Sequence, residues 1–262
     1  MDSVRSRFPD QKPCLNGWSL MPSPVAIEAY AKLGWNSVTI DMQHGWWDYA
    51  GAVTALAVLQ GAAVVPFVRV PTNEPGVIGR MLDAGAVGII CPMINSAEDA
   101  RRLVRHALYP PLGERSSGPV RGAPFPPPGN DRHREANRHL ILLPQIETRE
   151  AVDNAEAIMD TPGIGGIYVG PGDLGLSMGL PAMLDRPEPE LLGIYETLAV
   201  AAKMRGQIAG IHNHSADYAR RMVRLGFDFV TVGSDLGHML MNGLSDVRRF
   251  ADAPGGTAPS AY

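Results

Sequence analysis

Polar side chains follow several of the apolar segments of this chain, at the point where each segment ends. Asp41-Met-Gln-His44 follows one segment and Arg69 ends the next, while Gln145-Ile-Glu147 and Gly170-Pro-Gly-Asp173 follow two later ones. If these segments are parallel strands of one barrel, their carboxyl ends lie on one face and the polar groups converge there. Three acids, a histidine and an arginine in one place suit acid–base chemistry beside a bound cation.

Glu147 and Asp173 are candidate metal ligands. They come from neighbouring segments and offer hard oxygen donors, which suit an octahedral Mg²⁺ or Mn²⁺ that keeps positions open for substrate oxygens. The alternative is that each acid caps a helix or pairs with a loop arginine. Asp173 also lies where a helix could begin, and Gly172 before it lets a ligand approach the backbone N–H groups. That arrangement suits a bound carboxylate.

His44 and Arg69 are the candidate proton-transfer and anion-binding groups. A histidine that a carboxylate orients and makes more basic is the usual general base near neutral pH, and the spacing predicts Asp41 as that carboxylate. The alternative is a structural histidine. An unpaired arginine is costly to bury, so Arg69 should face an anion, for which an enolate or a carboxylate would serve.

The elements that must position these residues alternate along the chain. Continuous apolar runs, typical of strands buried on both faces, occupy residues 17–21, 35–40, 64–68, 87–91, 140–145, 166–169, 208–211 and 229–232. Stretches with helical spacing lie between them, among them 25–33, 98–108, 150–159, 190–204 and 216–225. This alternation predicts an α/β fold, a single (β/α)8 TIM barrel of parallel strands over 1–262, in preference to a doubly wound open sheet. We expect an N-terminal tail at 1–14, a long Pro-, Gly- and Arg-rich loop at 110–137 and a mobile tail at 251–262.

Composition excludes several classes of partner. The 262 residues carry 23 Lys+Arg against 27 Asp+Glu, with a formal net charge of -4, so the chain has no positive excess for binding nucleic acid. No apolar run reaches the roughly 18 residues that span a bilayer, and the polar start does not resemble a signal peptide, so we expect a cytoplasmic protein with no membrane partner. The two cysteines, Cys14 and Cys91, should be reduced thiols, with Cys91 buried.

The motifs together resemble those of the HpcH/HpaI family of metal-dependent pyruvate aldolases, over residues 17–250. The resemblance rests on Asp41-x-x-His44, Arg69-Val70-Pro71, Gln145-Ile-Glu147-Thr148 and Gly170-Pro-Gly-Asp-Leu174. It implies a divalent metal, Mg²⁺, Mn²⁺ or Co²⁺, held by Glu147 and Asp173. It also implies His44 as proton acceptor, Asp83 as the acid that raises its basicity, Arg69 as enolate stabiliser, and Gln145, Gly172 and the Asp173 backbone as contacts of a 2-oxo acid. Asp41 then remains a candidate for the hydrogen bonds that support the reacting groups from outside.

The sequence departs from the family pattern in two places. Gln43 stands where relatives often carry a glutamate, which removes a carboxylate next to the base. His212-Asn-His214 stands at the end of the seventh predicted strand, where relatives tend to carry apolar residues that line the acceptor pocket. We therefore expect His212 to contact a polar acceptor substrate. The alternative is that His212 and His214 form a purely structural pair.

The resemblance implies the reversible cleavage of a 4-hydroxy-2-oxo acid to pyruvate, or hydroxypyruvate, and an aldehyde through a metal-stabilised enolate. Two alternatives stay open: a citrate-lyase-β-like lyase acting on acyl-CoA, and a non-catalytic small-molecule-binding barrel. The arginines at 115, 121, 132 and 134 keep the acyl-CoA alternative open as possible phosphate contacts. A Schiff-base mechanism is disfavoured, because Lys12, Lys32 and Lys203 are the chain's only lysines and none ends a predicted strand.

The resemblance further implies a homo-oligomer, commonly a hexamer in which the C-terminal helix packs on a neighbouring subunit. Residues 235–250 place apolar side chains on roughly one helical stripe: Leu236, Met239, Leu240, Leu244, Val247 and Phe250. The stripe fits docking on a neighbour and fits equally packing on the chain's own barrel.

Overall fold

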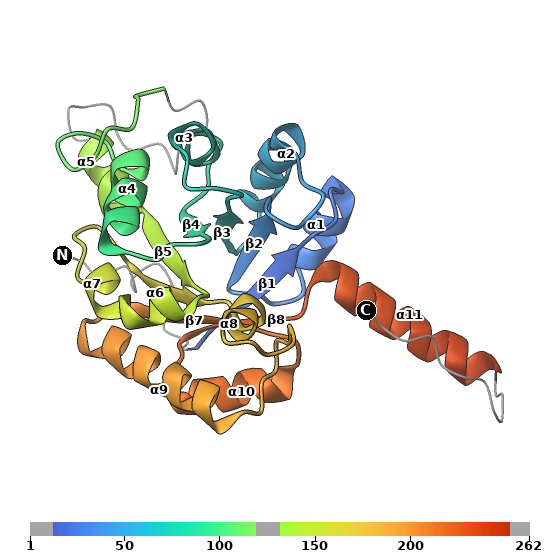
Figure 1. The fold of residues 1–262 in the computed structure, drawn as a ribbon. Coiled ribbons are helices and arrows are strands. Elements are labelled where there is room, and N and C mark those ends of the chain that lie inside the picture. The colour runs from blue at the N-terminus through green and yellow to red at the C-terminus, as the bar shows by residue number, and fades with distance from the viewer. Residues whose placement is uncertain (1–12, 119–131, 252–262) are drawn as a thin grey trace.

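The computed structural model describes residues 13–118 and 132–251, and its core is a closed barrel of parallel strands (Figure 1). The strands follow one another around the barrel in chain order, and the last pairs with the first. They are β1 (Cys14–Ser19), β2 (Ser37–Asp41), β3 (Val65–Arg69), β4 (Gly88–Cys91), β5 (Ile141–Ile146), β6 (Gly166–Val169), β7 (Ile208–Asn213) and β8 (Phe229–Val232). The predicted (β/α)8 barrel is confirmed.

Helices cover the outside of this barrel, except for α11 at the end of the described chain (Figure 1). In chain order the helices are α1 (Pro24–Ala31), α2 (Tyr49–Leu59), α3 (Pro75–Asp83), α4 (Ala97–Ala107), α5 (Arg132–His139), α6 (Arg149–Asp153), α7 (Ala155–Met159), α8 (Pro171–Ser177), α9 (Pro189–Met204), α10 (Ala216–Leu225) and α11 (Asp235–Ala251). The single helix predicted over 150–159 is divided at Asn154, whose φ and ψ are not helical. The segment predicted as a loop at 110–137 ends in helix α5, supported by an Arg138–Glu135 ion pair one turn apart.

The strands read as continuous apolar runs because both of their faces are buried. One face packs under the helices and the other fills the barrel, where Phe67 and Phe229 lie with ring centres 5.1 Å apart. Gly88 is required beside them, since a Cβ at this position would fall 2.0 Å from the Phe67 ring. Polar residues share the barrel interior, among them Asn16 and Thr231, and they bond to one another.

Helix ends turn toward the next strand through glycines, as at the end of α10. Gly226 has φ 111°, a left-handed conformation that side chains other than glycine adopt at a cost. Each such turn directs the chain to the amino end of the following strand. The loops that follow the strands therefore meet at the opposite, carboxyl end of the barrel, where the candidate residues lie.

Helix α11 leaves the barrel and extends away from it (Figure 1). Asp235 anchors its start, accepting hydrogen bonds from the Ser19 hydroxyl and the Leu20 backbone N–H. Farther along, the side chains of Val247 and Phe250 are 66% and 92% exposed, so this stripe does not pack on the chain's own barrel. In the described part of the chain, no helix is both long and apolar enough to cross a membrane.

Candidate active site

Asp41 and Arg69 form a buried ion pair at the carboxyl ends of β2 and β3. The Arg69 Nε and Nη2 atoms lie 2.8 and 2.5 Å from the two carboxylate oxygens of Asp41. Trp18 donates from Nε1 to the same carboxylate, and its ring lies 4.8 Å from the Arg69 guanidinium carbon. Burial acts to raise the pKa of Asp41, but Arg69 and two backbone N–H groups outweigh burial and lower it. The anion that faces Arg69 is thus Asp41.

The expectation that Asp41 orients the His44 imidazole is wrong. Asp41 Oδ1 accepts from the backbone N–H of His44 at 3.3 Å, and its strong partner is Arg69. This shapes the turn after β2, which Gly45 completes because a Cβ there would lie 2.3 Å from the Asp41 carbonyl oxygen. The His44 side chain is exposed, and within the described residues its imidazole has no hydrogen-bond partner.

Glu147 is a buried carboxylate just beyond the end of β5, only 1% exposed. Its Oε1 accepts from the Met93 backbone N–H at 2.7 Å, and its Oε2 accepts from the Gln145 side-chain amide. Burial raises the pKa of Glu147 to about 7, and the negative charge of Asp173 adds to the effect. Both of these donors to Glu147 are uncharged, so they do not balance its negative charge.

Asp173 lies in the first turn of α8 with its side chain exposed to solvent, near enough to Glu147 for its charge to raise the pKa of that carboxyl group. The turn approaches Glu147 closely at Gly170, where a Cβ would lie 3.0 Å from Glu147 Oε2 and 2.9 Å from Gln145 Nε2. At Gly172, by contrast, a Cβ would meet nothing within 4 Å. Glu147 and Asp173 thus follow the carboxyl ends of β5 and β6, and Gly172 leaves open space beside the backbone that precedes Asp173.

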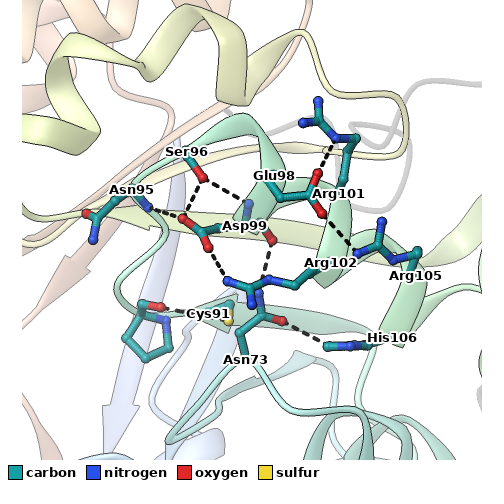
Figure 2. Close-up of polar contacts among 11 residues, drawn as sticks. Asn73, Cys91, Asn95, Ser96, Glu98, Asp99, Arg101, Arg102, Arg105 and His106 are labelled. Atoms are coloured by element: carbon teal, nitrogen blue, oxygen red, sulfur yellow. Dashed lines mark hydrogen bonds and ion pairs between the residues drawn. The ribbon is translucent and has the colours of Figure 1, made fainter.

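The loop between β4 and α4 delivers the Met93 N–H to Glu147. Met93 has φ 54°, a left-handed conformation uncommon for a residue with a side chain. Figure 2 shows how the end of this loop is held: Asn95 donates its backbone N–H to Asp99, and Ser96 and Asp99 exchange side-chain and backbone bonds as a helix cap. The Asn95 side chain also accepts from the Thr148 hydroxyl at 2.5 Å, which ties the loop to the residue after Glu147.

His212, near the end of β7, faces the same end of the barrel. Its ring meets the Trp18 ring edge-on, with centres 4.6 Å apart, and its Nδ1 lies 3.0 Å from the Tyr168 hydroxyl. Burial and the Arg69 charge lower the pKa of His212 to about 3, so the imidazole is neutral. His214 is exposed and is fixed by its backbone N–H to Asp185.

Asp83 is not brought to His44 within one chain. Asp83 is the last residue of α3, which runs down to the start of β4, whereas His44 follows the far end of β2. At that place Asp83 accepts from Arg115 Nη2 at 2.5 Å, and Arg115 is stacked on Tyr109. The His44–Asp83 pair that the resemblance implies is therefore not formed within one chain.

Three contributors to the site lie outside the sequence prediction. Trp18 supports the Asp41–Arg69 pair from β1, Tyr168 supports His212 from β6, and the Met93 N–H supports Glu147. Trp18 and Tyr168 read in the sequence as core aromatics. The Met93 contact could not be predicted, because a backbone N–H group does not depend on residue type and the Met93 side chain is apolar.

Fold and site together describe a (β/α)8 barrel with Arg69, Glu147 and His212 at the carboxyl ends of its strands. The model of the HpcH/HpaI aldolase/citrate lyase family matches residues 17–242, and the chain belongs to this family of carbon–carbon lyases. The predicted family is thereby confirmed, together with the aldolase class of reaction.

Curated relatives and solved structures match along most of the chain. The hydroxypyruvate/pyruvate aldolase of Rhizorhabdus wittichii is 37% identical over 236 residues, 90% of this chain and 93% of the relative. The 5-keto-4-deoxy-D-glucarate aldolase of Salmonella arizonae is 36% identical over 220 residues, 84% of this chain and 85% of the relative. An HpcH/HpaI aldolase/citrate lyase family structure from Burkholderia cenocepacia superposes with a TM-score of 0.85 at 30% identity, covering 95% of this chain and 99% of that one.

Proposed function

We propose that this aldolase reversibly cleaves 4-hydroxy-2-oxo acids to pyruvate, or hydroxypyruvate, and an aldehyde. The observation that carries the proposal is the buried Glu147 carboxylate, deficient in positive charge, with Asp173 and Arg69 close enough to shift its pKa. These groups suit an oxo acid bound through its oxygens. The Rhizorhabdus wittichii relative is named for hydroxypyruvate and pyruvate, which supports this class of donor.

The residues around Glu147 fit a divalent cation. The charge of the Asp173 carboxylate acts on Glu147, and the Gln145 Oε1 atom is buried with no hydrogen-bond partner among the described residues. Gly170 leaves room at Glu147 that a side chain would fill. We propose that Glu147 and Asp173 hold Mg²⁺, Mn²⁺ or Co²⁺, oxygen-preferring ions that leave positions for substrate oxygens. Such an ion supplies Lewis acidity toward the keto oxygen, which makes the adjacent C3–H bonds more acidic.

The 2-oxo acid is positioned by Arg69 and the start of α8. Two guanidinium nitrogens of Arg69 are used by Asp41, while Nη1 has no partner in the part of the chain that the structure describes. Nη1 donates to the keto oxygen and, more strongly, to the enolate oxygen that replaces it. The backbone N–H groups of Gly172 and Asp173 lack acceptors within the first helical turn and bind the carboxylate. Gln145 completes this side of the pocket.

His44 moves the protons. In cleavage it takes the proton of the 4-hydroxyl group, directly or through a water molecule, as the C3–C4 bond breaks. The bonding electrons pass to C3 and the keto group, which gives the aldehyde and the enolate. The proton then returns to C3 of the enolate and yields pyruvate, so no redox partner is required. In the synthetic direction the same groups act in reverse order.

The geometry does not favour the acyl-CoA alternative. Arg115 is bound to Asp83 near the amino ends of the strands, and α5, which carries Arg132 and Arg134, also leads into the amino end of β5. The carboxylate pair lies at the opposite ends of the strands. Arg121 lies outside the described residues.

We further propose that the chain forms a homo-oligomer, a hexamer, in which α11 packs on a neighbouring copy. The exposed stripe of α11 supports this assembly because its own barrel does not cover it. A role for Asp83 beside His44 requires such a second copy. We expect light scattering to give six chains for the full sequence, and smaller species for Val247→Glu/Phe250→Glu. A monomeric wild-type protein would contradict the assembly.

The proposal also places the enzyme in the cytoplasm, in keeping with Cys14 and Cys91 being buried free thiols. The direct test of function is pyruvate release from 4-hydroxy-2-oxoglutarate and from shorter 4-hydroxy-2-oxo acids, followed with lactate dehydrogenase before and after EDTA. Release that EDTA stops and Mg²⁺ or Mn²⁺ restores supports the proposal. Binding of 2-oxo acids without any turnover would indicate a non-catalytic barrel.

A further inference from the structure

A line of polar side chains crosses the inside of the barrel and ends at its mouth on His212. Asn16 Nδ2 lies 2.9 Å from Thr231 Oγ1, which lies 2.6 Å from the Tyr168 hydroxyl oxygen. That oxygen lies 3.0 Å from His212 Nδ1. The four residues come from β1, β8, β6 and β7, and all but His212 are buried. Packing on several strands therefore fixes the line in place.

The direction of its hydrogen bonds follows from Asn16. The Asn16 Oδ1 atom accepts from two hydroxyl groups of β2, at 2.7 and 3.1 Å, so the amide NH₂ group donates to Thr231. Thr231 accepts from Asn16, so the assignment that gives every hydroxyl hydrogen an acceptor has Thr231 donating to the Tyr168 oxygen and the Tyr168 hydroxyl donating to His212 Nδ1. In this assignment Nδ1 accepts, so the single ring proton of the neutral His212 imidazole is on Nε2.

The Nε2–H group of His212 is available to a ligand. No partner for it occurs in residues 13–118 or 132–251, and it is not sealed from solvent, because His212 is partly exposed. The ring lies against Trp18, which also contacts Arg69 and Asp41. The free donor thus lies at the same end of the barrel as the candidate catalytic groups, on a strand that supplies neither of the proposed metal ligands.

We propose that His212 is a specificity-determining residue, a fixed uncharged donor that binds a hydroxyl oxygen on the aldehyde-derived part of the substrate, with Tyr168 as its positioning residue. The inference rests on the proposed aldolase function. It predicts a preference for aldehydes that carry a hydroxyl group next to the carbonyl. An uncharged imidazole suits a hydroxyl oxygen rather than a carboxylate, and an apolar group at this place would leave the donor unpaired.

The test compares glycolaldehyde, which has that hydroxyl group, with acetaldehyde, which lacks it, in aldol addition to pyruvate. In His212→Leu we expect the ratio of the two kcat/KM values to fall about tenfold relative to wild type, the cost of one lost buried hydrogen bond. In Tyr168→Phe the ring stays in place and the ratio should fall partway. The matched control is His214→Leu, since only the backbone of His214 is engaged, and there the ratio should equal that of wild type.

A second readout does not depend on turnover. Nitrogen-15 NMR of histidine-labelled wild-type protein should show His212 as the neutral Nε2–H tautomer near neutral pH, and Tyr168→Phe should disturb that tautomer. A neutral Nδ1–H tautomer, or an imidazolium at pH 7, would overturn the inference. So would an unchanged aldehyde ratio in a folded His212→Leu protein that still exchanges the pyruvate methyl protons. Loss of that exchange in wild type would instead refute the aldolase function on which the inference rests.

Discussion

Arg69 and Asp41 are joined at two points, through Nε and Nη2 of the guanidinium and both carboxylate oxygens. The pair is buried and is braced by Trp18, so the guanidinium has one fixed orientation. Its remaining nitrogen, Nη1, is left without a partner among the described residues. The carboxylate that the sequence assigned to the histidine instead positions the arginine.

This relationship makes Arg69→Ala a stability variant as well as an activity variant. Removing the arginine leaves the Asp41 carboxylate buried without its cation, and we expect the free energy of unfolding to fall by about 3 kcal/mol. Arg69→Ala/Asp41→Ala removes both charges and should recover part of that loss. Urea unfolding of the two single variants and the double variant measures the coupling. Strictly additive effects would show that the pair contributes nothing.

Arg69→Lys separates positioning from charge. Lysine keeps the positive charge beside Asp41 but has no planar fork to hold the carboxylate at two points and still present a third nitrogen. We expect kcat to fall about 100-fold, as for loss of one oxyanion donor. Metal affinity, measured by calorimetry, should change little. A lysine variant with wild-type turnover would contradict the role of Nη1.

The pKa of Glu147 predicts a pH-dependent metal affinity. In metal-free protein this pKa is raised to about 7, so the carboxyl group is largely protonated below that pH and a cation must displace the proton. The apparent affinity for Mn²⁺ should therefore rise about tenfold per pH unit up to about pH 7 and level off above it. Calorimetry in buffers of different ionisation enthalpy should show close to one proton released per ion at pH 6.

The raised pKa of Glu147 also makes the stability of the metal-free protein depend on pH. A raised folded-state pKa means that Glu147 contributes stability fully below its unfolded-state pKa, and that this contribution falls as the pH rises to about 7. Metal-free wild type should thus lose stability between about pH 4.5 and pH 7 relative to Glu147→Gln, which cannot ionise. Parallel stability curves for the two proteins would contradict the raised pKa.

Gly170 tests whether the space beside Glu147 matters. An alanine Cβ would lie 3.0 Å from Glu147 Oε2 and 2.9 Å from Gln145 Nε2, so the carboxylate must shift. We expect Gly170→Ala to weaken Mn²⁺ binding about tenfold, the range found when the support of a ligand is disturbed. Gly172→Ala is the matched control for metal binding, because a Cβ there meets nothing within 4 Å.

Much of the fold could be predicted from the sequence because strands buried on both faces are continuously apolar. Each of the eight predicted runs overlaps a strand of the barrel, including the run at 17–21, which overlaps β1. The helix α5 escaped prediction because it lies in a polar, proline-rich context and is supported by ion pairs rather than an apolar stripe. The path of α11 away from the barrel is not a property of its own sequence, since an apolar stripe does not specify what it packs on.

In the site, position along the chain indicated which residues gather but not how they pair. The residues that follow strands β2, β3, β5 and β6 do meet at one end of the barrel. Proximity in sequence nevertheless suggested Asp41 for His44, whereas the two-point geometry of a neighbouring arginine takes that carboxylate. Asp83, assigned by resemblance alone, lies at the end of a helix that runs back to the other end of the barrel.

The most direct test of the account is exchange of the pyruvate methyl protons in D₂O, followed by NMR without any aldehyde. We predict exchange with wild-type protein that stops on adding EDTA, returns with Mg²⁺, Mn²⁺ or Co²⁺, and is lost in His44→Gln. Because this step needs only the cation site, Arg69 and the base, it does not depend on the identity of the acceptor. Absence of exchange from both pyruvate and hydroxypyruvate with every metal would contradict metal-dependent enolisation at this site.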